Sequence, residues 1–336
     1  MSAEFYKSLV FRKILLICCG TGLLLVLFVL DIANGPANYG FFEILQSFFS
    51  RSADKNLSVI VFDMRLPAAI AAVLAGASLG LSGAVMQTLL ANPLASPYTL
   101  GVGSAAGFGA AVGIVFFAGN FLSIGFFAFF FAILSIVFIY RLSNRINLGS
   151  SGIILIGIIL VFIYQSLQAF AIYVADEAEV SSIVFWTFGS LSKANYASLS
   201  IMLVVFAAAF FISLYNAWSF NAILLSDEIA QSMGVCVRSF KIKMLILASV
   251  LTATCVCFVG TIGFVGLLGA HISRILIGAE QRFFLPFSAL IGALLLSFSS
   301  ILSKNLISGV IFPIGIITSF IGALFFLAIV LNKGRG

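Results

Sequence analysis

The 336-residue chain is 62% hydrophobic and only 8% charged, with a net charge of +6 and a mean hydropathy of +1.23. A soluble domain carries about 25% charged residues, so this composition excludes a soluble protein and indicates one that crosses a membrane several times. The apolar runs are long and continuous, whereas a membrane β-barrel needs ~10-residue segments of alternating polarity. The predicted fold class is therefore an all-α polytopic membrane protein.

Ten apolar segments are candidates for membrane spans, in a chain with room for roughly nine to eleven helices of about 20 residues. In chain order they are 14–30, 66–90, 98–118, 120–140, 151–173, 197–217, 243–263, a short one at 264–276, 284–303 and 311–331. Residues 1–336 are expected to form a single transmembrane domain. Because ten is even, both termini should lie on the same side of the membrane.

Basic residues predict the orientation of the chain. With the N-terminus in the cytoplasm, 12 of the 17 lysines and arginines fall in inner segments and five in outer ones. Cytoplasmic segments carry the excess of Lys and Arg in membrane proteins, so both termini are predicted to be cytoplasmic. The first span follows Lys7, Arg12 and Lys13 like a signal peptide, but its length favours a retained helix. The positive charge thus reflects topology and gives no reason to expect nucleic-acid binding.

The second span and the loop after it have the most specific pattern in the chain. Residues 66–90 contain no ionisable group and are rich in Ala and Gly. Small residues let helix backbones approach closely in lipid, so this span is expected to pack tightly against other helices. Asn92-Pro93 and Ser96-Pro97 then predict the end of the helix and a compact turn.

The inner loop at 221–243, between the sixth and seventh spans, contains the pattern of a short helix. Ser226 can cap it, and Asp227 and Glu228 fall in its first turn, where the helix dipole favours negative charge. Gly234 can end it in the left-handed conformation. From the residues alone two interpretations stay open, a docking site for a cytoplasmic subunit and an ordinary interfacial loop.

Other features argue against catalysis and ion coupling. No G-x-x-x-x-G-K-[ST] loop is present, so ATP-driven transport would need an ATPase on a separate chain. The spans contain almost no charged residues in their interiors, which disfavours an ion-coupled secondary transporter, although neutral oxygens could coordinate sodium. An integral-membrane enzyme would need convergent catalytic groups, and His271 is the one histidine. We therefore expect no catalytic residues, no cofactor and no metal site.

Several distinct short motifs are spread over about residues 60–330. The first group is Arg65-Leu66-Pro67, Ser82-Gly83, Gln87, Asn92-Pro93-Leu94-Ala95-Ser96-Pro97 and Leu100-Gly101. The second is Trp186-Thr187-Phe188-Gly189-Ser190-Leu191, Asp227-Glu228-Ile229-Ala230, Met233-Gly234, Gly263-Phe264-Val265-Gly266-Leu267, His271 with Arg274, Leu285-Pro286, Pro313-Ile314-Gly315 and Gly322. Together they resemble the FecCD/BtuC-type permeases, the membrane subunits of ABC importers for ferric siderophores, haem and cobalamin.

The resemblance implies a ten-helix permease that forms a homodimer or heterodimer around a central pathway. Two cytoplasmic ABC ATPase subunits and an external substrate-binding protein are the implied partners, in the inner (cytoplasmic) membrane of a bacterium. The chain would be a transport subunit that works by alternating access, and ATP hydrolysis would reside on the partner. A ferric siderophore is the expected cargo because it is the commonest in the family, with haem or cobalamin as alternatives.

The resemblance also assigns roles to individual residues. ATPase coupling is assigned to Ser226, Asp227, Glu228, Ala230 and Gly234, the cytoplasmic gate to Asn92 and Leu94, and binding-protein docking to Arg65 and Lys304. The chain departs from the usual family pattern at Ala68, Ala270, Ser300 and Ala323. The family often has Arg at the first of these positions and Asp at the third, so the departures reduce the charge expected on the outer face.

Overall fold

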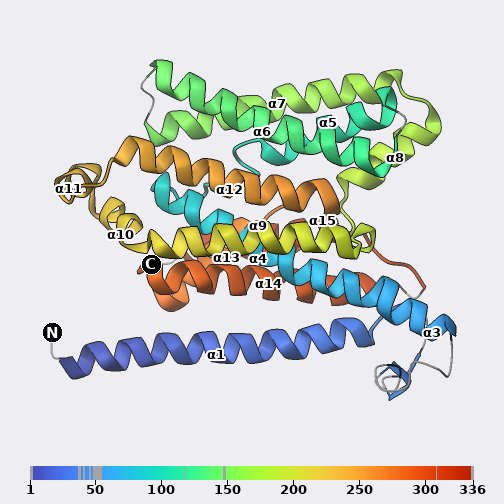
Figure 1. Ribbon diagram of the computed structural model, residues 1–336, viewed down its shortest axis with the longest axis horizontal. Coiled ribbons are helices and arrows are strands. Elements are labelled where there is room, and N and C mark those ends of the chain that lie inside the picture. The colour runs from blue at the N-terminus through green and yellow to red at the C-terminus, as the bar shows by residue number, and fades with distance from the viewer. Residues whose placement is uncertain are drawn as a thin grey trace.

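The computed structural model describes residues 3–36, 39–40, 42–44, 47, 55–117, 119–146, 149–307 and 309–333. Within these ranges the chain is almost entirely helical, and the only β pairing is an isolated bridge between Ile307 and Val310. The helices run side by side along one direction and form an elongated bundle (Figure 1). The all-α prediction is confirmed.

Among the described residues, seven helices are long and apolar enough to cross a membrane, and three further apolar helices are shorter; the sequence analysis expects ten spans. The long spans lie in α1 (Ala3–Ala33), α4 (Leu66–Leu89) with the turns before it, α6 (Phe121–Ile146), α7 (Ser150–Val174), α9 (Tyr196–Tyr215), α12 (Val237–Val259) and α14 (Gln281–Asn305). The shorter apolar stretches are α5 (Val102–Phe116), α13 (Val265–Ile277) and residues Ile314–Ile329 of α15 (Ile314–Lys333).

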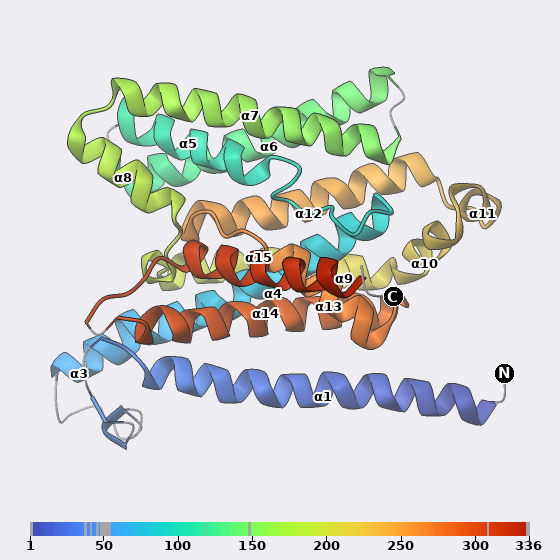
Figure 2. The same cartoon turned by 180° about the vertical axis from the view of Figure 1, so that it is seen from behind.

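Connecting helices lie at the two ends of the bundle. One end, which we call the inner end, carries α10 (Ala217–Leu225) and α11 (Asp227–Ser232) (Figure 1). The opposite, outer end carries α3 (Lys55–Val59), the π-helix η1 (Ile60–Arg65), α8 (Glu177–Thr187) and the 3-10 helix η2 (Leu191–Lys193). Both the beginning of α1 and the end of α15 lie at the inner end (Figure 2).

The small-residue helix α4 lies at the centre of the bundle, where it packs against α12, α13 and α14. Almost all of its residues are buried. A Cβ added at Gly80 would lie 2.2 Å from the carbonyl oxygen of Ser288, and one at Gly83 would lie 2.0 Å from that of Gly266. The backbones of α14 and α13 therefore touch the backbone of α4 directly, as the composition predicts.

The first helix, α1, lies at the edge of the bundle along α14 and is largely exposed (Figure 1). An ion pair attaches it to α14 near each end. At the inner end, Lys13 Nζ lies 2.8 Å from Glu280 Oε2, and at the outer end Lys304 Nζ lies 2.7 Å from Asp31 Oδ1. These two contacts fix a helix that has little buried surface of its own.

Replacing Gly292 by Ala is expected to lower the melting temperature of the purified protein, since the new Cβ would lie 2.2 Å from the carbonyl oxygen of Gly76. Overpacking of this kind costs about 1–3 kcal/mol. Gly22→Ala in α1 is the matched control, because it makes the same helical exchange where nothing lies within 4 Å. Equal melting temperatures for the two variants in a thermal unfolding assay would contradict the close packing of α4 and α14.

Candidate functional site

The helix predicted in the inner loop is present as α11, and it begins where the sequence indicates. The Oγ of Ser226 accepts a hydrogen bond from the backbone N–H of Ile229 at 3.0 Å, which is an N-cap. Asp227 and Glu228 occupy the first turn. Their negative charge lies where the helix dipole favours it.

Gly234 ends α11 as predicted. It has a φ of +84°, a backbone conformation that favours glycine. Its N–H donates to the carbonyl of Gln231, and the N–H of Val235 donates to that of Ala230, both at 2.9 Å. This is the double hydrogen bond of a Schellman motif. Because hydrogen bonds from its own residues cap both ends, the start and the end of this six-residue helix are fixed locally.

One side of α11 is anchored to the bundle and the other is exposed. Ala230 is fully buried, and Asp227 Oδ2 accepts a hydrogen bond from Lys241 Nζ of α12 at 2.7 Å. On the exposed side, Ile229 and Met233 keep 43% and 64% of their surface accessible. The Lys241 contact, 14 residues away in sequence, was missed in the sequence analysis. Exposed apolar side chains on a rigid helix beside an exposed carboxylate, that of Glu228, suit a protein contact.

The loop between α4 and α5 makes the compact turn that the prolines predict. Asn92 Oδ1 accepts the N–H of Leu94 at 2.8 Å, an Asx turn, and Ala91 has a φ of +46°. Ala95 is fully buried and anchors the loop, whereas Leu94 is 58% exposed. The two residues assigned to the gate thus form one unit, in which the Asn92 side chain fixes the backbone that presents Leu94.

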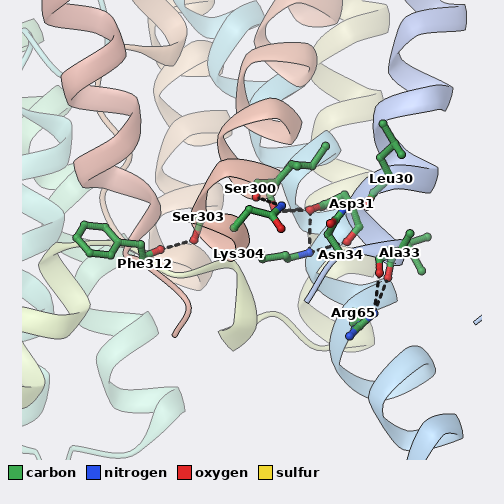
Figure 3. Close-up of polar contacts among 12 residues, drawn as sticks. Leu30, Asp31, Ala33, Asn34, Arg65, Ser300, Ser303, Lys304 and Phe312 are labelled. Atoms are coloured by element: carbon green, nitrogen blue, oxygen red, sulfur yellow. Dashed lines mark hydrogen bonds and ion pairs between the residues drawn. The ribbon is translucent and has the colours of Figure 1, made fainter. Parts of the chain in front are cut away.

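The two cations assigned to binding-protein docking are hydrogen-bonded to the end of α1 (Figure 3); Arg65 is buried, and the Lys304 side chain keeps 7% of its surface accessible. Lys304 Nζ donates to the carboxylate of Asp31 at 2.7 Å and to its carbonyl oxygen at 2.8 Å. Arg65 Nη1 donates to the carbonyl oxygens of Ile32 and Ala33, at 3.2 and 3.0 Å. Docking by these two residues stays a prediction.

Asp31, which sequence reasoning missed, is the centre of this outer cluster. It is 1% exposed, and Ser300 Oγ donates to its carboxylate at 2.8 Å. Ser300 stands where the family often has Asp, so the carboxylate at this place comes from α1 instead. The one signal in the sequence was an isolated acidic residue directly after the predicted span 14–30.

At the inner end, Glu280 pairs with two cations. Lys13 Nζ lies 2.8 Å from its carboxylate, and Arg282 Nε donates to it at 2.9 Å. Burial disfavours the charged form of Glu280, but the hydrogen bonds from Lys13 and Arg282 outweigh burial and hold the pKa of this carboxyl below its ordinary value.

His271 lies against the rings of Phe325 and Phe326, with ring centroids 6.3 and 5.8 Å away. In the described part of the chain, no three His, Cys, Asp or Glu residues are grouped closely enough to hold a metal ion. The expectation that the chain has no metal site stays a prediction.

The sequence matches the model of the FecCD transport family over residues 23–332. The chain belongs to this family. FecCD proteins are permease subunits of ABC importers, so the resemblance noted in the sequence and the fold class expected from it are confirmed. Permeases of this kind are transport subunits that function with ATPase and substrate-binding partners.

Permease proteins of two bacterial transport systems match most of the chain. It is 32% identical over 320 residues to the hemin transport system permease protein of Yersinia pestis, covering 93% of this chain and 95% of that one. It is 34% identical to the molybdate import system permease protein of Haemophilus influenzae, covering 82% of each. A solved structure described as an inward-facing conformation of a metal-chelate type ABC transporter matches with a TM-score of 0.84 at 30% identity, covering 94% of this chain and 99% of that one.

Asp31→Ala is expected to destabilise this FecCD permease by about 3–5 kcal/mol, because it leaves the buried Lys304 without its carboxylate. Lys304→Met in the same chain should recover part of the loss, since the unpaired charge is then removed. Asp63→Ala, at an exposed position of η1, is the control. A melting temperature of Asp31→Ala equal to that of the control would show that the pair is not holding α1.

Glu280→Gln is expected to lower the melting temperature at neutral pH. Because the native pKa of Glu280 lies below its ordinary value of 4.5, its contribution to stability is fully present above about pH 4.5 and is lost as the pH falls through the native value. The difference between wild type and variant should therefore disappear in acid, which melting curves between pH 3 and pH 7 can measure. Glu177→Gln, on the exposed start of α8, serves as the control, and a pH-independent difference for Glu280→Gln would contradict the ionic tether.

Proposed function

We propose that this chain imports a ferric siderophore across the cytoplasmic membrane of a bacterium, by alternating access that a separate ATPase drives. A second permease chain completes the pathway, two ATPase subunits bind at the inner end, and a substrate-binding protein docks at the outer end. The observation that carries the proposal is the capped, partly exposed helix α11 in a chain that belongs to the FecCD family.

The inner end is proposed to face the cytoplasm, because the excess of basic residues lies in the segments at that end. Helix α11 then points at the ATPase. Ala230 and the Asp227–Lys241 pair attach α11 to the bundle, so a push on its exposed side is passed to α12. Ser226 and Gly234 define its ends and Glu228 supplies an exposed charge, which gives each assigned coupling residue a separate part.

The gate role of Asn92 and Leu94 is supported by the position of their loop. The loop begins at the end of α4, the helix that packs against α12, α13 and α14. Since α12 is also the helix to which α11 is tied, a movement at α11 reaches the start of the gate loop through two packed helices. These contacts support a short mechanical route from the proposed ATPase contact to the proposed gate.

At the outer end, docking by Arg65 and Lys304 would require these residues to exchange hydrogen bonds that they make within the chain. Both cations donate hydrogen bonds to backbone carbonyls in the last turn of α1. A binding protein that engages them with carboxylates would compete with Asp31 and would act on α1 at the same time.

Glu228→Arg is expected to weaken association with the ATPase at least tenfold, since like-charge contacts at an interface cost several kcal/mol. Glu228 is the better target because reversing Asp227 would also break its pair with Lys241. Glu177→Arg, at the outer end, is the control with the same charge change. Co-purification with the ATPase, for which Glu177→Arg is the control, and ATP-dependent uptake measure the effect, and full retention of both by Glu228→Arg would refute the coupling role of this residue.

The cargo can be tested with the permease, its ATPase and its binding protein in proteoliposomes. We expect ATP-dependent uptake of a radiolabelled ferric siderophore that survives collapse of the ion gradients. Preferential uptake of haem, cobalamin or molybdate would assign a different cargo to the same importer. Uptake that needs an ion gradient and no ATP would instead support a secondary transporter and refute the importer mechanism.

A further inference from the structure

A cavity of about 420 Å³ lies at the inner end of the bundle, between α6, α7, α11 and α12. Sites for small molecules typically measure about 300–1,000 Å³ and are mostly apolar, with a few polar groups at defined places. The deep wall of this cavity is apolar and includes Ile136, Ile153 and Leu245. It therefore has the size and lining of a ligand site, and no ligand has been assigned to it above.

The mouth of the cavity is polar and carries a positive charge. Arg238, Lys241 and Asp227 line it. An adjoining hollow of about 800 Å³ shares Arg238 and adds Lys243. Three cations and one carboxylate thus line the two spaces, and the carboxylate is already paired with Lys241 at 2.7 Å. The mouth is complementary to an anion.

The cavity extends from the end of the spans into their apolar part. Tyr140, near the end of α6, lines both hollows, and tyrosines of membrane proteins are enriched at the level of the lipid head groups. Ile246, two turns further along α12 than Arg238, lies on the cavity wall and keeps 40% of its surface exposed. Charge at one end and exposed apolar wall at the other match the two parts of a phospholipid.

We propose that this cavity binds one anionic phospholipid of the inner leaflet, with its phosphate at Arg238 and Lys243 and an acyl chain along Ile153, Leu245 and Ile246. Basic pockets between membrane helices on the cytoplasmic side recognise anionic head groups in this way. Binding at this site would require neither a particular cargo nor a bound ATPase.

The bound lipid would contact the two elements that the proposed transport cycle moves. Asp227 and Gln231 of α11 line the cavity, and so do Leu90 and Leu100, which flank the gate loop. A lipid in this position fills the space between α11 and the start and end of that loop. A bound anionic lipid would thus help to hold α11 and the ends of the gate loop in their positions.

Native mass spectrometry of the full-length permease, titrated with phosphatidylglycerol or phosphatidylcholine, tests the proposal. We expect one phosphatidylglycerol per chain, bound at least fivefold more tightly than phosphatidylcholine. Arg238→Gln should weaken phosphatidylglycerol binding about fivefold, the effect of removing one basic residue near an anionic head group. Arg12→Gln, an exposed cation near the inner end of α1, is the control and should bind like wild type.

Equal binding of the two lipids, or equal binding by Arg238→Gln and the control, would overturn the proposal. Displacement of the lipid by millimolar inorganic phosphate would also overturn it, because the site would then be one for a free anion. Ile246→Trp tests the apolar part, since the exposed position tolerates a larger side chain that narrows the cavity. Binding of phosphatidylglycerol by this variant at the wild-type level, with an unchanged melting temperature, would exclude the acyl-chain position.

Discussion

The direct contact between the backbone of α4 and those of α13 and α14 is the constraint on which the rest of the bundle depends. Glycines on the facing surfaces leave no room for a side chain, so carbonyl oxygens of one helix lie where a Cβ of the other would be. In lipid, where apolar side chains gain little by leaving their surroundings, such close packing is a main source of helix association. The more peripheral parts, α1 and the α10–α11 segment, are attached to this central group.

Ion pairs attach peripheral elements of this protein to the rest of the bundle. Among the described residues, three of the four ion pairs join different helices, where α1 meets α14 and α11 meets α12, and the fourth joins Arg282 to Glu280 at the start of α14. At the outer end, these internal contacts also affect the surface proposed for docking. Two cations that a family resemblance assigns to an external partner are bonded inside the chain, so the outer surface presents less positive charge than the sequence suggests.

The sequence predicts those features that depend on neighbouring residues. Helix α9 was expected as the sixth span at 197–217 and runs from Tyr196 to Tyr215, because hydropathy alone defines a span. The ends of α11 were also predictable, since the cap and the terminal glycine act within a few residues. The Asp31–Lys304 pair was not, because its partners lie 273 positions apart and nothing in either segment specifies the other. The inner cavity was equally hidden, since it is formed by side chains from several separate helices.

The attachment of α1 to α14 at both ends has a mechanical consequence. A helix held at one end can tilt when the bilayer becomes thinner or thicker, and tilting is the usual response to hydrophobic mismatch. With ion pairs at Lys13 and Asp31, α1 tilts only together with α14. Because α14 is in backbone contact with α4, the thickness of the surrounding membrane acts, through this peripheral and largely exposed helix, on the centre of the permease.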